Sequence, residues 1–252
     1  MAQDRFQSSR FEQKYIITEE TALQVRDYVR GRLELDEHAV GKPNFSYPVH
    51  SLYLDSDKLK LYWSTINGDK NRFKLRLRFY DEDPNTPVFL EIKERTNNTL
   101  LKKRAPVQRD AVAGLLTGQT DDPSHVTDPK HFGALEDFCE RMYEHDARPK
   151  VHVAYFREAY MTRDDNSVRL TLDREVRAEP QPPPAKEEGQ VVNLSTTMQN
   201  PTLIWGHDVV LEAKFTDRFP NVFRDLVRIF GLRQCGAAKY VDSVATLREY
   251  LR

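Results

Sequence analysis

The sequence predicts an α+β fold whose largely antiparallel sheet closes into a β-barrel, forming a tunnel with a basic lining flanked by helices. Three observations predict it. Many consecutive segments alternate apolar and polar residues with the period of a strand. A few amphipathic helical segments lie mostly toward the ends of the chain. Lysine and arginine recur on one side of the alternating segments, so a closed sheet would turn its cations inward and its apolar residues outward.

A chain of 252 residues suits one large domain or two small ones. We interpret 1–252 as a single domain with a proline-rich loop insertion near 180–190, because the segments before and after that stretch resemble each other.

The formal net charge of -1 gives no bulk attraction to nucleic acid or to an anionic membrane. Cys139 and Cys235 are too few for a disulfide framework, which favours a cytoplasmic protein. No apolar run could span a bilayer, so attachment to a membrane would require a membrane-protein partner.

Four helices are predicted. Thr18 can cap the first, and Glu19 and Glu20 lie in its first turn, where the helix dipole favours anions. Pro220 suits the first turn of the third helix, and Gly231 can end it. The other two are predicted from apolar spacing, one near His131 to Glu144 and one from Asp242 onward.

Seven segments alternate clearly enough to be predicted as strands. Two turn signals of the hairpin type, Asn67-Gly68 and Asn97-Asn98, lie between some of them. The predicted strands are 49–54, 72–80, 87–94, 100–108, 150–161, 167–176 and 208–216.

One face of the predicted strands carries an excess of cations. For any single strand, an antiparallel sheet with one solvated face and one core face is the simpler interpretation. Across the whole set, however, the signs are not mixed as on an ordinary solvated face, and like charges on neighbouring strands destabilise a sheet. A bound polyanion would offset this repulsion. The ten cations are Lys14, Lys74, Arg76, Arg78, Lys93, Lys102, Arg104, Arg157, Arg169 and Lys214, and the four acids are Glu12, Glu91, Asp173 and Glu212.

Linear phosphates suit such a face. Arginine offers two parallel donors to a phosphate, and lysine offers a compact charge. A cation-lined interior must stay wet and hold counter-ions, because an isolated buried charge costs several kcal/mol. The sequence has no P-loop, no kinase glycine-rich loop and no persuasive Ser-His-Asp set. Phosphoryl transfer asks mainly for positioning and charge neutralisation, so chemistry on a phosphate does not need those motifs.

Among the acids, Glu212 is the leading candidate for a metal ligand. A hard cation such as Mg²⁺ or Mn²⁺ takes few carboxylates and several phosphate oxygens. The alternative is that Glu212 forms an ion pair within the sheet, with Lys214 or a cross-strand arginine. Glu12 and Asp173 are weaker candidates, and the seven histidines have no ligand spacing.

Several short motifs follow one another in a characteristic order. They are Arg10–Tyr15, Leu75–Tyr80, Leu90–Lys93, Lys102–Arg104, Tyr155–Arg157, Arg169–Asp173, Leu211–Phe215 and Lys239–Tyr240. With these motifs the chain resembles a VTC domain, the polyphosphate polymerase domain of the vacuolar transporter chaperone complex, within the triphosphate tunnel (CYTH-like) superfamily. The resemblance extends over roughly Arg5 to Leu251.

This resemblance implies transfer of the γ-phosphate of ATP to a growing polyphosphate chain, with a divalent metal, Mn²⁺ or Mg²⁺. The implied partners are ATP and polyphosphate, and no nucleic acid. Glu212 would be the metal ligand, and Tyr155, Arg104 and Lys74 would be further binding residues. The phosphate contacts carried over to this chain are Lys14, Arg76, Arg78, Lys93, Lys102, Arg157, Arg169, Lys214 and Lys239.

Other functions stay open. The triphosphatase branch of the superfamily begins with two alternating glutamates, and Arg10 at the first of these positions favours the polymerase branch. A non-catalytic module would bind polyphosphate or another polyanion without turnover. Nucleic-acid binding is a weaker alternative. Tyr80 and Tyr155 could stack on bases, but a closed tunnel excludes a duplex and no nucleic-acid motif is present.

Overall fold

The computed structural model divides the chain into two compact units. Unit 1 comprises Met1–Tyr47, Phe156–Glu175 and Trp205–Ala237, and unit 2 comprises Pro48–Tyr155, Val176–Ile204 and Ala238–Arg252. The single domain expected from the sequence stays a prediction. Most of the proline-rich loop predicted near 180–190 lies outside the described residues. The structure describes residues 10–97, 99–118, 123–163, 167–181, 192–216 and 218–251.

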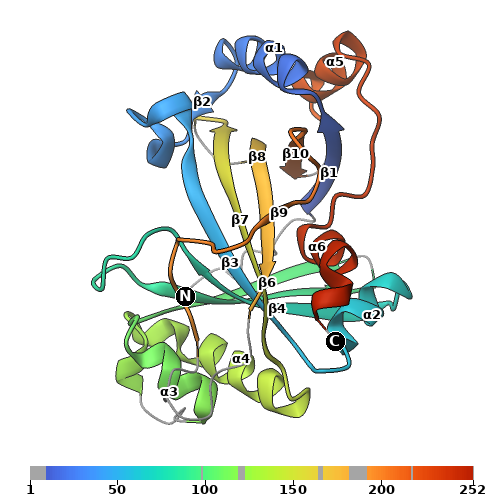
Figure 1. Ribbon diagram of the computed structural model, residues 1–252. Coiled ribbons are helices and arrows are strands. Elements are labelled where there is room, and N and C mark those ends of the chain that lie inside the picture. The colour runs from blue at the N-terminus through green and yellow to red at the C-terminus, as the bar shows by residue number, and fades with distance from the viewer. Residues whose placement is uncertain are drawn as a thin grey trace. The chain divides into compact units, whose positions relative to one another are not determined.

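The described strands form one ten-stranded sheet (Figure 1). Its order is β1-β10-β8-β7-β3-β4-β5-β6, with β2 beside β7 and β9 beside β8. The ladders of β1 with β10, β10 with β8, β3 with β4, β4 with β5 and β5 with β6 are antiparallel. The predicted α+β class with a largely antiparallel sheet is therefore confirmed. Over the described residues the path is open, with β1 and β6 as its end strands, so the predicted closure into a barrel is not confirmed.

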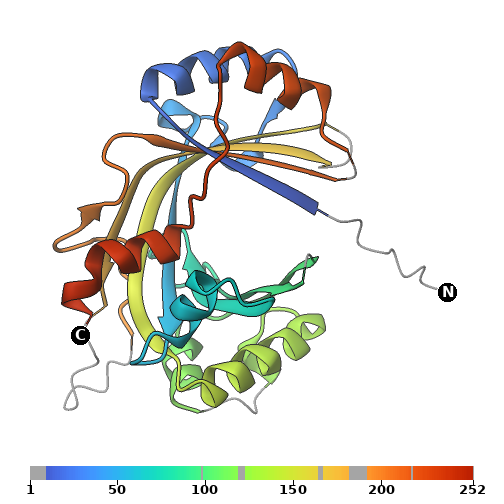
Figure 2. The same cartoon turned by 90° about the vertical axis from the view of Figure 1, so that its right-hand side faces the viewer.

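In unit 1, two helices lie side by side over one face of the strands (Figure 2). Val25 from α1 and Phe223 from α5 are fully buried against Leu211 of β10. This packing takes up the apolar side of the alternating strands and leaves the charged side on the other face. The elements are β1 (Arg10–Ile17), α1 (Glu19–Arg30), β2 (Glu34–Leu35), β10 (Val209–Thr216), α5 (Asn221–Ile229) and parts of β7 (Arg148–Met161) and β8 (Val168–Pro180).

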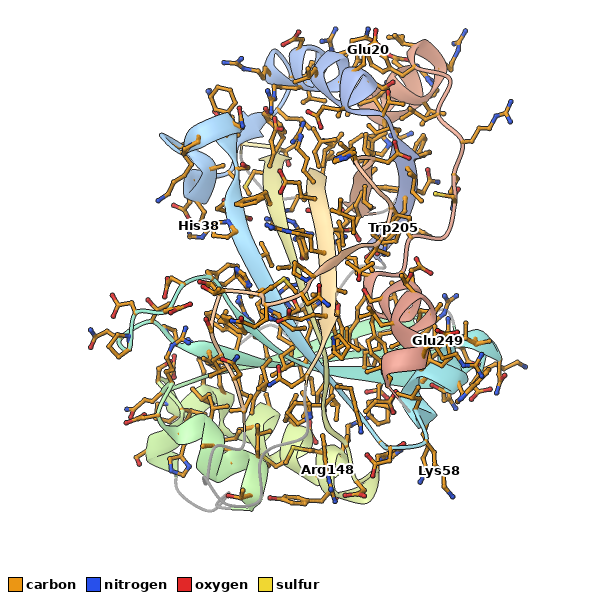
Figure 3. The ribbon with its side chains drawn as sticks, viewed as in Figure 1. Glu20, His38, Lys58, Arg148, Trp205 and Glu249 are labelled. Atoms are coloured by element: carbon orange, nitrogen blue, oxygen red, sulfur yellow. The ribbon has the colours of Figure 1, made fainter. Side chains whose placement is uncertain are left out.

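The predicted cap of α1 and the predicted stop of α5 are confirmed, whereas Pro220 precedes the first turn of α5 and does not lie in it. Oγ1 of Thr18 accepts a hydrogen bond from the N–H of Thr21 at 3.2 Å. Glu20, in the first turn, extends outward from α1 in Figure 3. α5 begins one residue after Pro220, which takes the cap position, and Gly231 follows its end with a φ of +59°.

Unit 2 has its own core, between its strands and α4 (Phe132–Glu144), a helix that the sequence predicts. Leu77 of β4, Ile92 of β5 and Phe138 of α4 are buried there. The other elements are β3 (Tyr47–Asp55), α2 (Lys60–Ile66), β4 (Asn71–Phe79), β5 (Val88–Thr96), β6 (Thr99–Val107), α3 (Ala111–Thr117), β9 (Thr202–Leu203) and α6 (Lys239–Leu247). Short 3₁₀ turns occupy Glu37–Ala39, Pro43–Phe45, Pro123–His125, Pro129–His131 and Arg248–Tyr250.

Three local predictions need correction. α2 and α3 are absent from the predicted helices, because they are only seven residues long and have no side-chain cap of their own. Asn67-Gly68 is not a hairpin turn, because Asn67 ends α2 and Gly68, with a φ of +73°, leads into β4. α6 begins at Lys239 and not at Asp242. Asp242 instead caps it from inside the first turn, where its Oδ2 accepts the N–H of Ala238 at 2.9 Å.

Helices that could cross a membrane are not found. Within the part of the chain that the structure describes, none is both long enough and apolar enough.

Candidate functional site

The sequence-predicted residues fall into two groups, one in each unit. We call the group in unit 1 the paired face and the group in unit 2 the basic face. The paired face consists of Glu12, Lys14, Asp36, Arg157, Arg169, Asp173, Glu212 and Lys214. The basic face consists of Lys74, Arg76, Arg78, Glu91, Lys93, Lys102 and Arg104 on β4, β5 and β6, with Tyr53, Tyr155 and Lys239 beside them.

Glu91 organises the basic face. It lies directly between Arg76 of β4 and Arg104 of β6 in the strand register. Its side chain is only 1% exposed, and it accepts from Arg76 at 2.6 Å and lies 2.7 Å from Lys102 and 3.1 Å from Arg104. Burial raises the pKa of this carboxyl group, but the charges of Arg76, Arg78 and Lys102 outweigh burial and hold the pKa well below its usual range. Glu91 therefore stays ionised and fixes the cations around it.

Arg78 is held differently. Its Nη2 donates to Oη of Tyr155 at 3.0 Å and to Oγ of Ser51 at 3.1 Å. The side chain is buried, with 7% of the residue exposed. Hydroxyl oxygens satisfy hydrogen bonds without neutralising the charge. Arg78 is thus oriented by two neutral groups and keeps its positive charge for an anion.

Lysines meet across the three strands of the basic face. Lys93 stands opposite Lys74 on one side and opposite Lys102 on the other. Lys74 Nζ lies 5.9 Å from the centre of the Tyr240 ring, and Lys239 Nζ lies 4.8 Å from that of Tyr155. Like charges placed directly opposite one another destabilise a sheet. The repulsion among these three lysines therefore destabilises the sheet, and a bound anion would reduce that repulsion.

Tyr53 is a member of the basic face that is missing from the sequence-predicted residues. It pairs with Arg76 in the register of β3 and β4, and Nη1 of Arg76 donates to its Oη at 3.2 Å. Burial raises the pKa of the phenol, but Arg76, Arg78 and Lys74 outweigh burial and lower it to about 8. Tyrosine counts as a core residue in an alternation pattern. Its place on the polar side of β3, in step with Arg76, is the only signal that could have found it.

We expect the phenol of Tyr53 to titrate near pH 8, two units below an ordinary tyrosine. The measurement is the absorbance titration of the wild type minus that of Tyr53→Phe, which isolates one of the 11 tyrosines. Tripolyphosphate should raise the midpoint, because a bound anion offsets the arginines that stabilise the phenolate. A midpoint near 10 without ligand would show that Arg76 and Arg78 do not act on this phenol.

On the paired face, acids and cations alternate. Glu212 is 5% exposed, and its carboxylate lies 3.3 Å from Lys214, 3.8 Å from Lys14 and 3.9 Å from Arg157. Lys14 also lies 3.0 Å from Glu12. The register explains the arrangement, since Lys14 stands opposite Glu212 and Lys214 opposite Glu12 on the antiparallel strands β1 and β10.

Both arginines of the paired face are also matched by an acid. Arg157 donates to both carboxylate oxygens of the fully buried Asp173, at 2.7 and 2.8 Å. Arg169 Nη2 donates at 2.9 Å to Asp36, which belongs to no strand. A count of charged residues that follows strand alternation therefore leaves Asp36 out.

The cation excess is consequently unequal between the faces. On the paired face, the four cations Lys14, Arg157, Arg169 and Lys214 are matched by Asp36 and by the three predicted acids Glu12, Asp173 and Glu212. On the basic face, the strands carry six cations and the one acid Glu91, which pairs with Arg76, Lys102 and Arg104. The excess predicted from the sequence is thus located in unit 2.

Within the described residues, no group of three or more His, Cys, Asp and Glu side chains could hold a metal ion. Glu212 and Glu12 offer carboxylates, but Lys14 and Lys214 lie close to both. Mg²⁺ is commonly bound through one or two carboxylates plus substrate phosphates, so this donor set fits a metal that arrives with a phosphate. The ion pair to Lys214 exists, and the metal role of Glu212 stays a prediction.

Comparisons with known proteins complete the description. A family model described as the VTC domain matches residues 9–248. The vacuolar transporter chaperone complex subunit 2 of Schizosaccharomyces pombe is 26% identical over 156 residues, a match that takes in 58% of this chain and 21% of the length of that subunit. Among solved structures, the PH1819 protein from Pyrococcus horikoshii OT3 is 13% identical, with a TM-score of 0.45 over 94% of this chain and 98% of that one.

Proposed function

Because the chain belongs to the VTC domain family, we propose that it is a polyphosphate polymerase, which transfers the γ-phosphate of ATP to a growing polyphosphate chain. The observation that carries this proposal is the basic face, whose strands carry six cations and one acid, with Arg76, Lys102 and Arg104 paired to that acid. These cations repel one another unless a bound anion offsets their charge. A linear phosphate carries repeated negative charge, so cations at every second residue of neighbouring strands can contact several of its units.

The residues of the basic face would bind and orient the phosphates. Arg78 presents its guanidinium group from the hydroxyls of Ser51 and Tyr155. Arg76 and Lys102 are fixed by Glu91 before any ligand arrives. Donors that are already in place need no reorganisation when charge moves between phosphates, which is the main protein contribution to phosphoryl transfer.

Glu212 would hold a divalent metal on the paired face, and phosphate oxygens would complete the ligands of that metal. The metal, Mn²⁺ or Mg²⁺, would neutralise negative charge on the phosphate oxygens that it binds. Lys14 and Lys214 would hold the carboxylate of Glu212 in place through the ion pairs that they form with it.

The function is tested by incubating the purified protein with ATP and Mn²⁺ and separating the products on a polyphosphate gel. We expect chains that grow with time and only with metal. Release of free phosphate alone would indicate the triphosphatase of the same superfamily. ATP decay that is equal with and without metal would overturn the proposal.

A second candidate is a non-catalytic polyanion-binding module. The observation that favours it is the carboxylate of Glu212, which has three cations within 4 Å. In this case the protein binds polyphosphate, yet the gel shows no product at any metal concentration. The relative from Schizosaccharomyces pombe is named as a subunit of a complex, and we extend to this chain a role beside a protein partner.

Glu212→Gln is expected to lower metal-dependent turnover roughly a hundredfold or more, because a metal contributes several kcal/mol to transition-state stabilisation. Tripolyphosphate binding in the absence of metal should be retained, since the basic face is untouched. Glu12→Gln is the matched control, because it removes an acid that pairs with the same two lysines. Equal losses in both variants would assign the effect to the ion pairs and not to a metal.

A further inference from the structure

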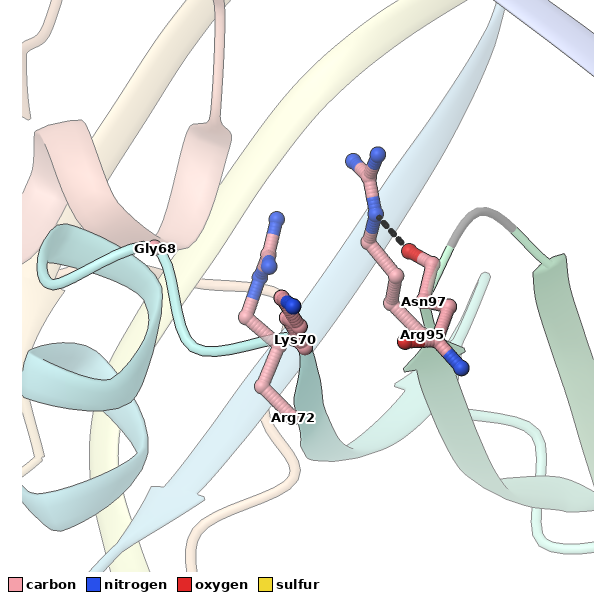
Figure 4. Close-up of a pocket in the computed structure, with 5 residues that line it drawn as sticks. All are labelled: Gly68, Lys70, Arg72, Arg95 and Asn97. Carbon is pink, nitrogen blue, oxygen red and sulfur yellow. Dashed lines mark hydrogen bonds between the residues drawn. The ribbon is translucent and has the colours of Figure 1, made fainter.

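A pocket opens at the end of the hairpin formed by β4 and β5 (Figure 4). It has a volume of about 420 Å³ and is lined by Gly68, Lys70, Arg72, Arg95 and Asn97. No carboxylate is among these residues. The side chains of Arg72 and Arg95 extend to the same side of the hairpin in Figure 4. The pocket is therefore a cationic cavity, built by two strands and the connection from α2.

The two arginines are held next to each other despite their like charge. Arg72 stands directly opposite Arg95 in the register of β4 and β5. Nη1 of Arg72 donates to the carbonyl of Asp69 at 2.5 Å, and Nε of Arg95 donates to the carbonyl of Asn97 at 2.9 Å. Desolvation and the positive charge of Arg95 lower the pKa of Arg72. The negative charge of Asp69 acts in the opposite direction. Backbone carbonyls therefore orient both guanidinium groups without neutralising their positive charge.

Backbone conformation shapes the pocket. Gly68 has a φ of +73° and Asn97 a φ of +54°, both in the left-handed region that glycine and asparagine tolerate best. The N–H of Asn97 donates to the carbonyl of Lys70 at 2.9 Å, which closes the α2–β4 connection onto the end of β5. Lys70 is thereby fixed at the rim of the pocket, and three cations surround one cavity.

This pocket continues the basic face. Arg72 has the same strand parity as Lys74 and Arg76, and Arg95 has the same parity as Lys93 and Glu91, so all of them lie on one side of the sheet. Four residues of an antiparallel strand span about 14 Å, and this is the backbone distance from Arg76 to Arg72. A triphosphate is shorter than that, whereas a longer chain could reach both ends.

We propose that the Arg72–Arg95 pocket is a second phosphate subsite, which binds the units of a polyphosphate chain that extend beyond those held at Arg76 and Arg78. The inference rests on the proposed function, because it takes a linear polyphosphate as the ligand of the basic face. It adds selection by length. The basic face holds a short phosphate by itself, and the pocket strengthens the binding of long chains only.

The test compares two ligands and three proteins by calorimetric titration at fixed salt, since screening weakens exposed anion contacts. The ligands are tripolyphosphate and long-chain polyphosphate. The proteins are the wild type, Arg72→Gln/Arg95→Gln, and the control Lys103→Gln/Arg148→Gln. The control also removes two positive charges from unit 2, but Lys103 has the opposite strand parity and pairs with Asp137, and Arg148 pairs with Asp146.

We expect the pocket variant to lose about tenfold or more of its affinity for long-chain polyphosphate, as for one lost charged hydrogen bond, with tripolyphosphate affinity unchanged. The control should retain the wild-type ratio of the two affinities. Removing two facing charges should not destabilise the fold, and a thermal melt checks this.

Two results would overturn the subsite. One is a pocket variant that binds both ligands as tightly as the wild type. The other is an equal loss for both ligands, which would make the pocket a source of long-range charge only. A wild type that binds neither ligand would instead refute the proposed function, so the two failures are distinguishable.

Discussion

Arg78→Gln is expected to weaken tripolyphosphate binding by about ten- to a hundredfold, the worth of one or two charge-assisted hydrogen bonds. The melting temperature of the empty protein should change little. Glutamine can still donate to Ser51, which lies 3.3 Å from Nε of Arg78, and no buried carboxylate loses a hydrogen-bond donor. The measurements are calorimetric titration and thermal melts, with and without tripolyphosphate.

Two further variants sharpen this test. Arg148→Gln makes the same chemical change at an exposed arginine of unit 2, which is labelled in Figure 3 and pairs with Asp146, and this variant should bind like the wild type. Arg76→Gln should also lose affinity but, unlike Arg78→Gln, should destabilise the empty protein, because Arg76 is a close partner of the buried Glu91. Equal ligand-induced shifts of the melting temperature in the wild type and in Arg78→Gln would remove Arg78 from the binding site.

Glu91→Gln is expected to destabilise the empty protein by about 3 kcal/mol, the low end of the cost of breaking a buried ion pair. The low end applies because Lys102 and Arg104 are partly exposed and solvent screens their charge. For a chain of this size the melting temperature should fall by about 6–12 °C. At the same time the variant should bind tripolyphosphate more tightly than the wild type, because the basic face has lost its only acid. Ligand should therefore restore most of the lost stability.

The pH dependence of this loss has a definite sign. The pKa of Glu91 is lower in the folded protein than in the unfolded chain, so its stabilisation is present above the unfolded pKa and is lost as the pH falls below it. The difference in unfolding free energy between wild type and Glu91→Gln should accordingly shrink below about pH 4.3. Glu94→Gln is a matched control, because Glu94 pairs with Arg141 and has the opposite strand parity. A stability difference that persists unchanged at low pH would show that Glu91 acts through packing and not through its charge.

Sequence patterns predict the strands well and the charge balance poorly, for one physical reason. Alternation reports which side of a strand a residue occupies, so it places Arg76, Glu91 and Arg104 on one face, as the strand register confirms. Alternation does not report which residues from other parts of the chain pair with the side chains on that face. Asp36 lies outside every strand, yet it pairs with Arg169. It reduces the excess on the paired face, which the sequence could not show.

Helices and aromatic residues illustrate the same limit. α1 has its cap next to it in the sequence, at Thr18, and this signal predicts where the helix begins. α2 has no such signal, because its capping group comes from the end of β3. Tyr53 has an apolar ring and a polar hydroxyl, so its residue type does not predict which side of the strand it occupies. The position of Arg76, which donates to the hydroxyl, shows that Tyr53 belongs to the polar side. Closure of the sheet depends on pairing between distant strands, which alternation within one strand does not specify.

The carboxylate of Asp55 has a consequence for the order in which unit 2 can fold. It is fully buried at the end of β3 and accepts the N–H groups of Leu61 and Tyr62, each at 2.9 Å, as well as the hydroxyl of Tyr240 from α6. The first-turn amides of a helix normally exchange with solvent readily, because they have no partner inside the helix. Here they can be protected only after β3 has formed, so α2 is a late-forming element whose amides report on the strand. In a hydrogen-exchange experiment, Leu61 and Tyr62 should open together with β3, and an Asp55→Asn change should release them while the exchange of α4 stays slow.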